Sequence, residues 1–167
     1  MASPGDTTDA ADINDLVKYS QEAAVGKVTV TTAQALADAT DVAIQWTSEV
    51  FDSHGQHDNS TNNTRVTPNV AGVYEFWATV DFSPQTTPVQ SYAYFRKNGT
   101  TASGAASVVK GDATAQNTAS IHTMEEFNGT TDYFEVIANQ NSAGADTLNN
   151  SVQFSSFLEW KLVRAAL

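Results

Sequence analysis

The clearest pattern in the chain is an alternation over residues 73–82, in which every second residue from Tyr74 onward is apolar. Successive side chains of a strand point to opposite faces, so this period of two predicts a strand with one buried face. Gly72 comes just before it and can adopt the positive φ that a chain reversal requires. The residues expected to point into the core are Tyr74, Phe76, Ala78, Val80 and Phe82.

Further strands are predicted where apolar stretches lie between turn-forming residues. Asn98-Gly99 and Asn128-Gly129 favour hairpin turns, and residues 35–39 are ambiguous. The polar stretches at residues 52–63, 111–117 and 141–150 are expected to form surface loops. About nine strands, separated by turns, predict an all-β sandwich. They are expected at residues 27–32, 42–46, 65–68, 73–82, 91–97, 105–110, 118–127, 132–140 and 151–163.

The N-terminal segment contains the one stretch that favours a helix, residues 9–25, which Gly26 can terminate. Its narrow apolar stripe includes Ile13, Leu16 and Val17. A helix of about 15 residues is marginal alone, so the stripe needs a partner. That partner is the chain's own sandwich, a three-helix bundle, or another protein into which the helix docks. We therefore divide the chain into an anchoring arm with a short helix, residues 1–26, and a sandwich domain, residues 27–167.

The charge balance limits the partners. Eight Lys and Arg against nineteen Asp and Glu give a net charge of −11, which argues against binding to nucleic acid or anionic membranes. There is no cysteine for disulfides or metal–sulfur sites. The polar, acidic N-terminus lacks the features of a secretory signal peptide, and no window reaches the roughly 18 apolar residues of a membrane helix. We expect no membrane insertion.

Several short motifs together resemble the jelly rolls of complement globular heads and tumour-necrosis-factor-like proteins, in the versions found in bacteriophage structural proteins. They span about residues 27–163, most of the chain. The resemblance implies a β-sandwich of about eight to ten antiparallel strands that trimerises. It does not imply a catalytic activity, and we expect neither an enzyme nor a cofactor. The motifs are Phe51-Asp52, Gly55-x-His57-Asp58, Asn63-x-Arg65-Val66-Thr67, Ala71-Gly72-Val73-Tyr74, Lys97-Asn98-Gly99-Thr100 and a last strand at residues 154–158.

A trimer interface is expected on the second face of two strands. Val73 and Trp77 lie in the outer phase of the 73–82 strand, and Phe157 lies in the outer phase of the last strand. Exposed together, they would form an apolar patch of the kind that marks an interface. The resemblance implies that such a patch lies along a three-fold axis. The alternative is that the N-terminal segment covers this sheet.

A divalent cation could bind where carboxylates and imidazoles cluster, at Asp52, His54, His57 and Asp58. No helix fixes the two histidines, however, and the surrounding Asn and Ser residues are typical of solvated turns. In the resembling family, the Gly-x-His-Asp tract is a structural loop. We therefore favour the structural interpretation over a metal site, and we interpret the isolated His122 in the same way.

An enzymatic role is not supported by the acidic pairs. Glu125 and Glu126 are adjacent and would point to opposite faces of a strand, whereas Glu75 and Asp81 would lie about 20 Å apart along one. Nucleophile-elbow, phosphate-loop and dinucleotide motifs are also missing from the sequence. A carbohydrate-stacking surface remains possible, though core or interface positions are more usual for its aromatic candidates, Trp46, Trp77, Trp160, Tyr92 and Tyr94.

Three functional hypotheses follow. In the first, the chain is a phage virion structural protein, a trimeric capsid decoration protein or short head fibre whose N-terminal arm binds the major capsid protein or another virion protein. The second is a receptor-binding module at a tail tip, which contacts host surface glycan or protein through the loops at residues 52–63, 111–117 and 141–150. A secreted carbohydrate-binding domain is the third. The first two place the protein on the surface of the virion.

Overall fold

The computed structural model describes residues 23–85, 90–101, 106–110, 114–149 and 155–166. The predicted helix, with Ile13, Leu16 and Val17, lies outside these residues except at its C-terminal end. There the prediction is wrong, because Val25 and Gly26 belong to a strand, and the sandwich begins two residues earlier than expected. The described residues contain no helix and form thirteen strands, five of which are only two residues long.

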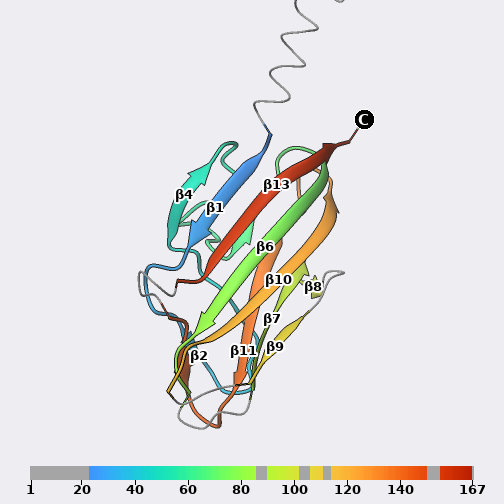
Figure 1. The fold of residues 1–167 in the computed structure, drawn as a ribbon. Helices are drawn as coiled ribbons and strands as arrows, with labels where there is room; N and C mark the ends of the chain where they lie inside the picture. The colour runs from blue at the N-terminus through green and yellow to red at the C-terminus, as the bar shows by residue number, and fades with distance from the viewer. Residues whose placement is uncertain (1–22, 86–89, 102–105, 111–113, 150–154, 167) are drawn as a thin grey trace, which may run out of the picture.

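Two antiparallel sheets pack face to face as two layers (Figure 1). The first sheet has the strand order β10 (Asn117–Phe127), β6 (Gly72–Phe82), β13 (Phe157–Ala165), β1 (Val25–Thr29) and β4 (Ser48–Asp52). The second has the order β3 (Val42–Ala43), β11 (Phe134–Asn141), β7 (Gln90–Lys97) and β8 (Thr100–Thr101). Two short strands extend the second sheet, with β5 (Arg65–Val66) paired to β11 and β9 (Ser107–Val109) to β7, while β2 (Ala35–Leu36) and β12 (Asp146–Thr147) form a separate pair.

The core lies between the two sheets and follows the predicted alternation. All five residues expected to point inward from β6 are fully buried. Phe76 stacks on Phe134 of β11 with ring centroids 3.9 Å apart, so the central strands of the two sheets meet at aromatic side chains. Val136 and Ala138, which share the phase of Phe134, are buried with it. This confirms the predicted all-β sandwich.

The largest difference from the prediction is β4, which the sequence pattern did not indicate. It forms an edge strand on β1, with a register shift between Lys27 and Val28, and its side chains are mostly exposed. An edge strand with no buried face carries no alternation to detect. The predicted strand at residues 42–46 also shortens to two residues. Ile44 still donates its backbone N–H to Val136 of β11 at 2.9 Å, but Trp46 donates its own to Asn63 instead.

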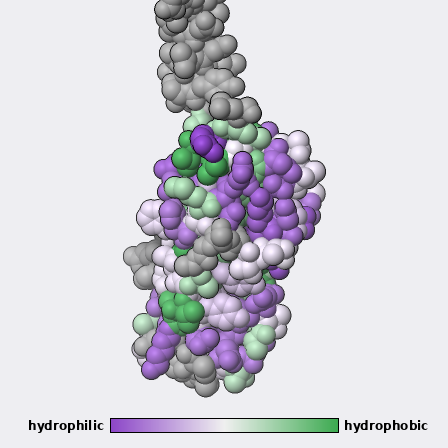
Figure 2. All heavy atoms as spheres, turned by 90° about the vertical axis from the view of Figure 1, so that its right-hand side faces the viewer, coloured by the Kyte–Doolittle hydropathy of each residue, from purple (hydrophilic) through white to green (hydrophobic). Residues whose placement is uncertain are grey.

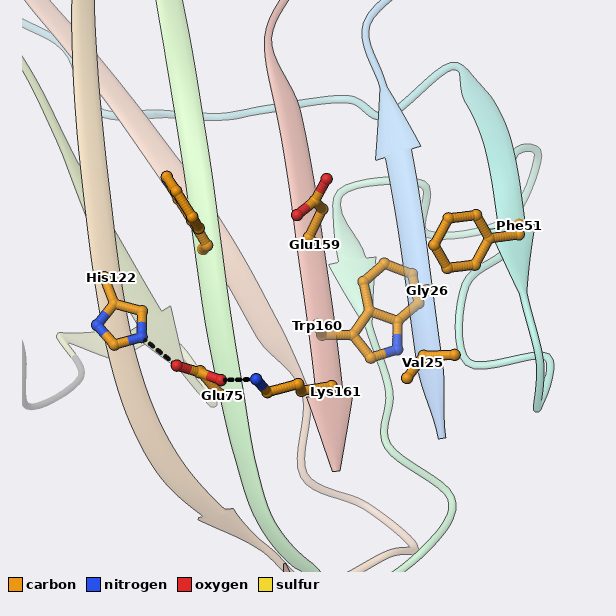
Figure 3. Close-up of a pocket in the computed structure, with 9 residues that line it drawn as sticks. Val25, Gly26, Phe51, Glu75, His122, Glu159, Trp160 and Lys161 are labelled. Carbon is orange, nitrogen blue, oxygen red and sulfur yellow. Dashed lines mark hydrogen bonds and ion pairs between the residues drawn. The ribbon is translucent and has the colours of Figure 1, made fainter. Parts of the chain in front are cut away.

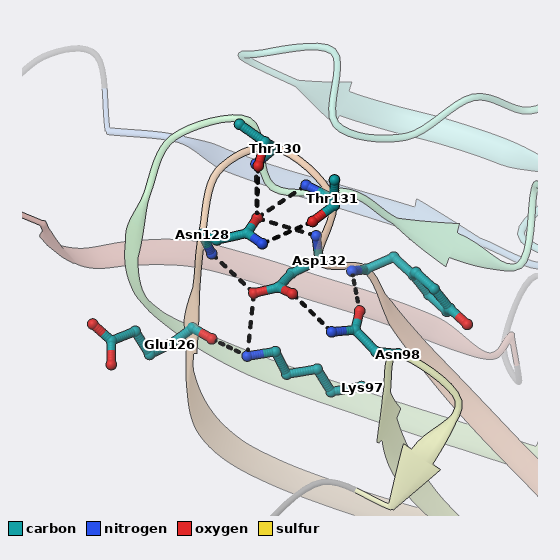
Figure 4. A network of polar contacts seen from close by, with 8 residues as sticks. Lys97, Asn98, Glu126, Asn128, Thr130, Thr131 and Asp132 are labelled. Atoms are coloured by element: carbon teal, nitrogen blue, oxygen red, sulfur yellow. Dashed lines mark hydrogen bonds and ion pairs between the residues drawn. The ribbon is translucent and has the colours of Figure 1, made fainter.

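Both predicted hairpin turns are present, and a polar network ties them together (Figure 4). The amide oxygen of Asn128 accepts the backbone N–H groups of Thr130 and Thr131 at 2.9 Å each. Asp132 accepts the side-chain amide of Asn98 at 2.7 Å and pairs with Lys97 at 3.4 Å. The network fixes the β7–β8 turn against the β10–β11 turn. It lies at the end of the domain where β13 ends (Figure 1).

Candidate functional site

The outer face of the first sheet carries an unusual number of exposed apolar side chains. Trp77 on β6 is 54% exposed, Met124 on β10 is 51% exposed and Phe51 on β4 is 49% exposed. These side chains are on three different strands of one sheet. The side of the domain shown in Figure 2 is mostly hydrophilic, with apolar residues only in small separate groups.

The strand register places Trp77 and Phe51 in one row across the sheet. From β10 to β4, this row consists of His122, Trp77, Glu159, Lys27 and Phe51. Lys27 and Glu159 form an ion pair of 2.6 Å between the two aromatic side chains. The charges of Lys27 and Glu159 therefore neutralise each other, and the side chains of Trp77 and Phe51 remain open to a partner.

A hollow of about 400 Å³ opens on this face (Figure 3). Its floor includes the buried indole of Trp160 and the backbone of Gly26, and Trp77 and Phe51 are among the residues that line it. Glu75 lies near one side and pairs with Lys161 at 2.6 Å and with His122 at 2.8 Å. The hollow is thus framed by aromatic rings and by acids and bases that already have partners.

The Glu75 carboxylate is electrostatically favoured in the folded chain. The hydrogen bond from Lys161, followed by that from His122, lowers the pKa of Glu75 below its ordinary value of 4.5. A lowered pKa means that the group adds stability above its unfolded pKa and loses that contribution as the pH falls through the folded value. The gain is small because the pair is close to solvent.

We therefore expect Glu75→Gln to flatten the acid side of the stability curve. The difference in unfolding free energy between wild type and variant should be less than about 1 kcal/mol at neutral pH and should vanish well below pH 4.5. Urea unfolding at neutral and acidic pH, at one fixed protomer concentration, measures this difference. A difference that persists in acid would mean that the ion pairs do not cause it.

The three residues predicted for the trimer interface all lie on this face. Trp77 and Val73 are on β6. Phe157 is on the neighbouring strand β13, where it pairs with Thr79 of β6. The ammonium of Lys27 lies 4.5 Å from the centroid of the Phe157 ring. Trp77 is the most exposed, and the other two are half-buried. Whether the three contact other subunits stays a prediction. Phe51 was not predicted on this face because the sequence pattern does not indicate β4, and Met124 was not predicted although it shares the phase of His122.

The two carboxylates among the four candidate metal ligands accept backbone hydrogen bonds within their own loop. The carboxylate of Asp52 accepts the backbone N–H groups of His54 at 3.0 Å and of His57 at 2.8 Å. Asp58 accepts the backbone N–H of Ser60 at 2.7 Å, and this bond helps to lower its pKa. Within the residues that the structure describes, no group of three or more His, Asp or Glu side chains could hold a metal ion.

The aromatic residues proposed for carbohydrate stacking do not form one surface. Trp46 and Trp160 are buried in the core, and only Trp77 is exposed on the first sheet. Tyr92 and Tyr94 lie on the outer face of the second sheet, on the opposite side of the domain. A single surface built from all five residues is therefore ruled out.

The three polar loops proposed as one recognition surface lie at two ends of the domain. Ser53, in the first loop, donates its backbone N–H to Val25 at 3.0 Å, at the start of β1. Leu148 and Asn117 instead both pair with Phe82, at the other end of the sandwich. The loop at residues 52–63 is thus separated from residues 141–149 and from the described part of the loop at residues 111–117.

Several solved structures share the fold at low sequence identity. The globular domain of a zebrafish complement 1qA protein has a TM-score of 0.64 at 11% identity, covering 87% of this chain and 100% of that chain. Murine APRIL at pH 5.0 has a TM-score of 0.61 at 13% identity, covering 84% and 99%. The Eiger TNF of S. frugiperda has a TM-score of 0.61 at 10% identity, covering 87% and 96%.

No family model and no curated protein matches the sequence. Identities this low show the fold alone, and they confirm the predicted jelly-roll architecture of complement-globular-head and tumour-necrosis-factor-like proteins. Among the described residues, no helix is long and apolar enough to cross a membrane.

Proposed function

We propose that the chain is a structural, non-enzymatic virion protein whose jelly-roll domain assembles as a homotrimer through the outer face of the first sheet. The observation that carries the trimer is the gathering of Trp77, Met124 and Phe51 on that one face. Large apolar side chains on several strands of one sheet favour burial against another copy. The place on a virion rests on the resemblance of the short motifs to bacteriophage structural proteins.

The residues before β1 would form the anchor that binds the major capsid protein or another virion protein. They join the domain at the start of β1, the same end at which β13 ends (Figure 1). Three such arms on one trimer would act together, and multivalency raises the overall affinity without any new contact. This arrangement suits a capsid decoration protein or a short head fibre on the particle surface.

The boundary of the anchor can be tested by deletion at the right residue. Ala24 is fully buried and its carbonyl accepts the N–H of Leu162 at 2.8 Å, so a cut after residue 26 would damage the fold itself. We expect deletion of residues 1–22 to leave a folded trimer that no longer binds particles lacking this protein. Cosedimentation, electron microscopy of the particles and light scattering measure the two effects separately.

Two results would contradict this proposal. A truncated protein that still decorates the particles would place the anchor in the jelly roll. Full-length protein that stays monomeric at micromolar concentration would remove the trimer, whether or not it binds particles.

A second function, host attachment at a tail tip, is favoured by the polar loop at residues 141–149, which lies at the end of the domain opposite the start of β1. An anchored trimer would turn this end outward. Density only at the tail tip in the same micrographs would support this function over capsid decoration.

A further inference from the structure

We propose that Tyr92 and Tyr94, with Asp41 and Asn139 at their edge, form a platform that binds a neutral saccharide. Both tyrosines lie on β7 in the outer phase of the second sheet. Their ring centroids are 6.3 Å apart and their planes differ by 24°. The platform is distinct from the proposed trimer face, which belongs to the other sheet.

The side chain of Tyr94 extends across the neighbouring strand β11. Its hydroxyl donates to a carboxylate oxygen of Asp41 at 2.6 Å. Asp41 immediately precedes β3, and the strand order is β3-β11-β7, so the side chain spans β11 to reach it, across strand spacings of about 4.8 Å. Ile137 of β11 lies directly opposite Tyr94 in the outer phase and is nevertheless fully buried. The side chain of Tyr94 therefore helps to cover Ile137.

Tyr92 lies beside Tyr94 with its ring nearly parallel, since the two ring planes differ by 24°. It is half-buried like Tyr94, and its neighbours across the strands are Asn139 on β11 and Val108 on β9. Val108 is 59% exposed and extends the apolar area beyond the second ring. Two nearly parallel aromatic rings beside an exposed valine offer an apolar surface against which the C–H face of a pyranose ring can pack.

Polar groups at one edge of the platform are held in place. Besides the Tyr94 hydroxyl, Asp41 accepts the side-chain amide of Asn139 at 2.7 Å, and Asn139 itself is buried. The hydrogen bond from Tyr94 is the largest cause that lowers the pKa of Asp41, so its carboxylate stays charged. Burial, and then the bond to Asp41, raise the pKa of Tyr94 to about 12, so its hydroxyl remains a donor. The exposed carboxylate keeps lone pairs for the hydroxyl groups of a ligand.

The charges on this face favour a neutral sugar over an anionic one. Asp41 is negative, and the whole chain carries −11. The two arginines that share the face, Arg96 and Arg65, both pair with Glu135, at 2.9 Å and 3.4 Å.

The experiment uses the full-length protein and isothermal titration with four neutral oligosaccharides: cellohexaose, maltohexaose, mannohexaose and chitohexaose. We expect at least one of them to bind with a Kd in the millimolar range or below, and Tyr92→Ala to weaken that binding by about tenfold. Tyr94→Phe keeps the ring but removes the bond to Asp41, so it should weaken binding less. Failure of all four sugars to bind at about 10 mM would overturn the proposal.

Tyr133→Ala is the matched control, because Tyr133 is another half-buried tyrosine near the second sheet, but the guanidinium of Arg65 already covers its ring at 3.9 Å. It should leave binding unchanged. Tyr92→Ala is preferred to Tyr94→Ala because it does not uncover Ile137, and circular dichroism checks that the variant folds. Unweakened binding in a folded Tyr92→Ala protein would place the sugar elsewhere. The proposal does not depend on trimerisation or on a virion, so it can fail without the proposed function failing.

Discussion

Trp77→Asp is expected to convert the proposed trimer into monomers and to leave the circular dichroism spectrum unchanged. The indole is 54% exposed and lies on the outer face of β6, so the core does not depend on it. In a trimer the indole would be buried between subunits. The aspartate would place an unpaired carboxylate there, next to Glu159 on the neighbouring strand.

The effect should be large because each trimer contains the substitution three times. Replacement of a central aromatic residue removes about 2 kcal/mol or more per interface, so three interfaces lose about 6 kcal/mol, or about four orders of magnitude in the association constant. Multi-angle light scattering across a dilution series measures the loss. Val108→Asp is the matched control, since Val108 is 59% exposed on the other sheet. A Trp77→Asp protein that remains trimeric would place the interface elsewhere.

The parts of the fold that the sequence predicted are those in which one physical pattern dominates. On β6, every second residue from Gly72 to Val80 is buried, as the sequence pattern predicts. On β11, the predicted inner residues Phe134, Val136 and Ala138 are buried, although the residues between them are buried as well. Asn98-Gly99 and Asn128-Gly129 form turns because a positive φ is needed there. Asn98, Gly99 and Gly129 adopt it. Local chemistry is sufficient at such positions.

The parts that were missed depend on contacts between distant segments. Phe51 is exposed at a sheet edge, and its membership of β4 follows only from the pairing with β1. Gly26 resembles a helix terminator in the sequence, yet it lies within a strand under the ring of Trp160. The hydrogen bond between Asp41 and Tyr94 can be predicted only if the order of strands β3, β11 and β7 is known. The sequence around either residue does not reveal that order.

The separation of the polar loops has the same cause. Residues 52–63 and 141–150 are similar in composition, and composition does not say at which end of a strand a loop leaves the sandwich. The structure places the first loop beside Val25 and the other beside Phe82. The two loops therefore cannot form one adhesive surface on a single domain. This weakens the receptor-binding hypothesis in the form that uses all three polar loops.

Gly26→Val is expected to lower the free energy of unfolding by about 3 kcal/mol, because overpacking of a core and the loss of buried hydrogen bonds act together. A Cβ at position 26 would lie 2.0 Å from a ring atom of Trp160, which is 3% exposed and cannot move outward without losing its packing. Its indole N–H donates to Gln56 at 2.6 Å, and Gln56 donates to the hydroxyl of Tyr74 at 3.0 Å. Displacement of the ring would thus also release the loop that Gln56 holds.

A control variant separates this clash from the general effect of replacing a glycine. Gly144→Val adds the same side chain where nothing lies within 4 Å of the new Cβ, so stability should change by no more than about 0.5 kcal/mol. Both variants are compared by urea unfolding at one protomer concentration, because the stability of an oligomer depends on concentration.

The double variant Gly26→Val with Trp160→Leu shows whether the indole is the cause. Trp160→Leu alone should destabilise by about 3 kcal/mol, as replacement of a large buried ring does. Since the smaller side chain leaves room for valine, the double variant should be less destabilised than the sum of the two single variants by 1 kcal/mol or more, in the range of about 0.5–3 kcal/mol found for residues in contact. Additive effects would mean that Gly26 is needed for its backbone in β1 rather than for the close approach of Trp160.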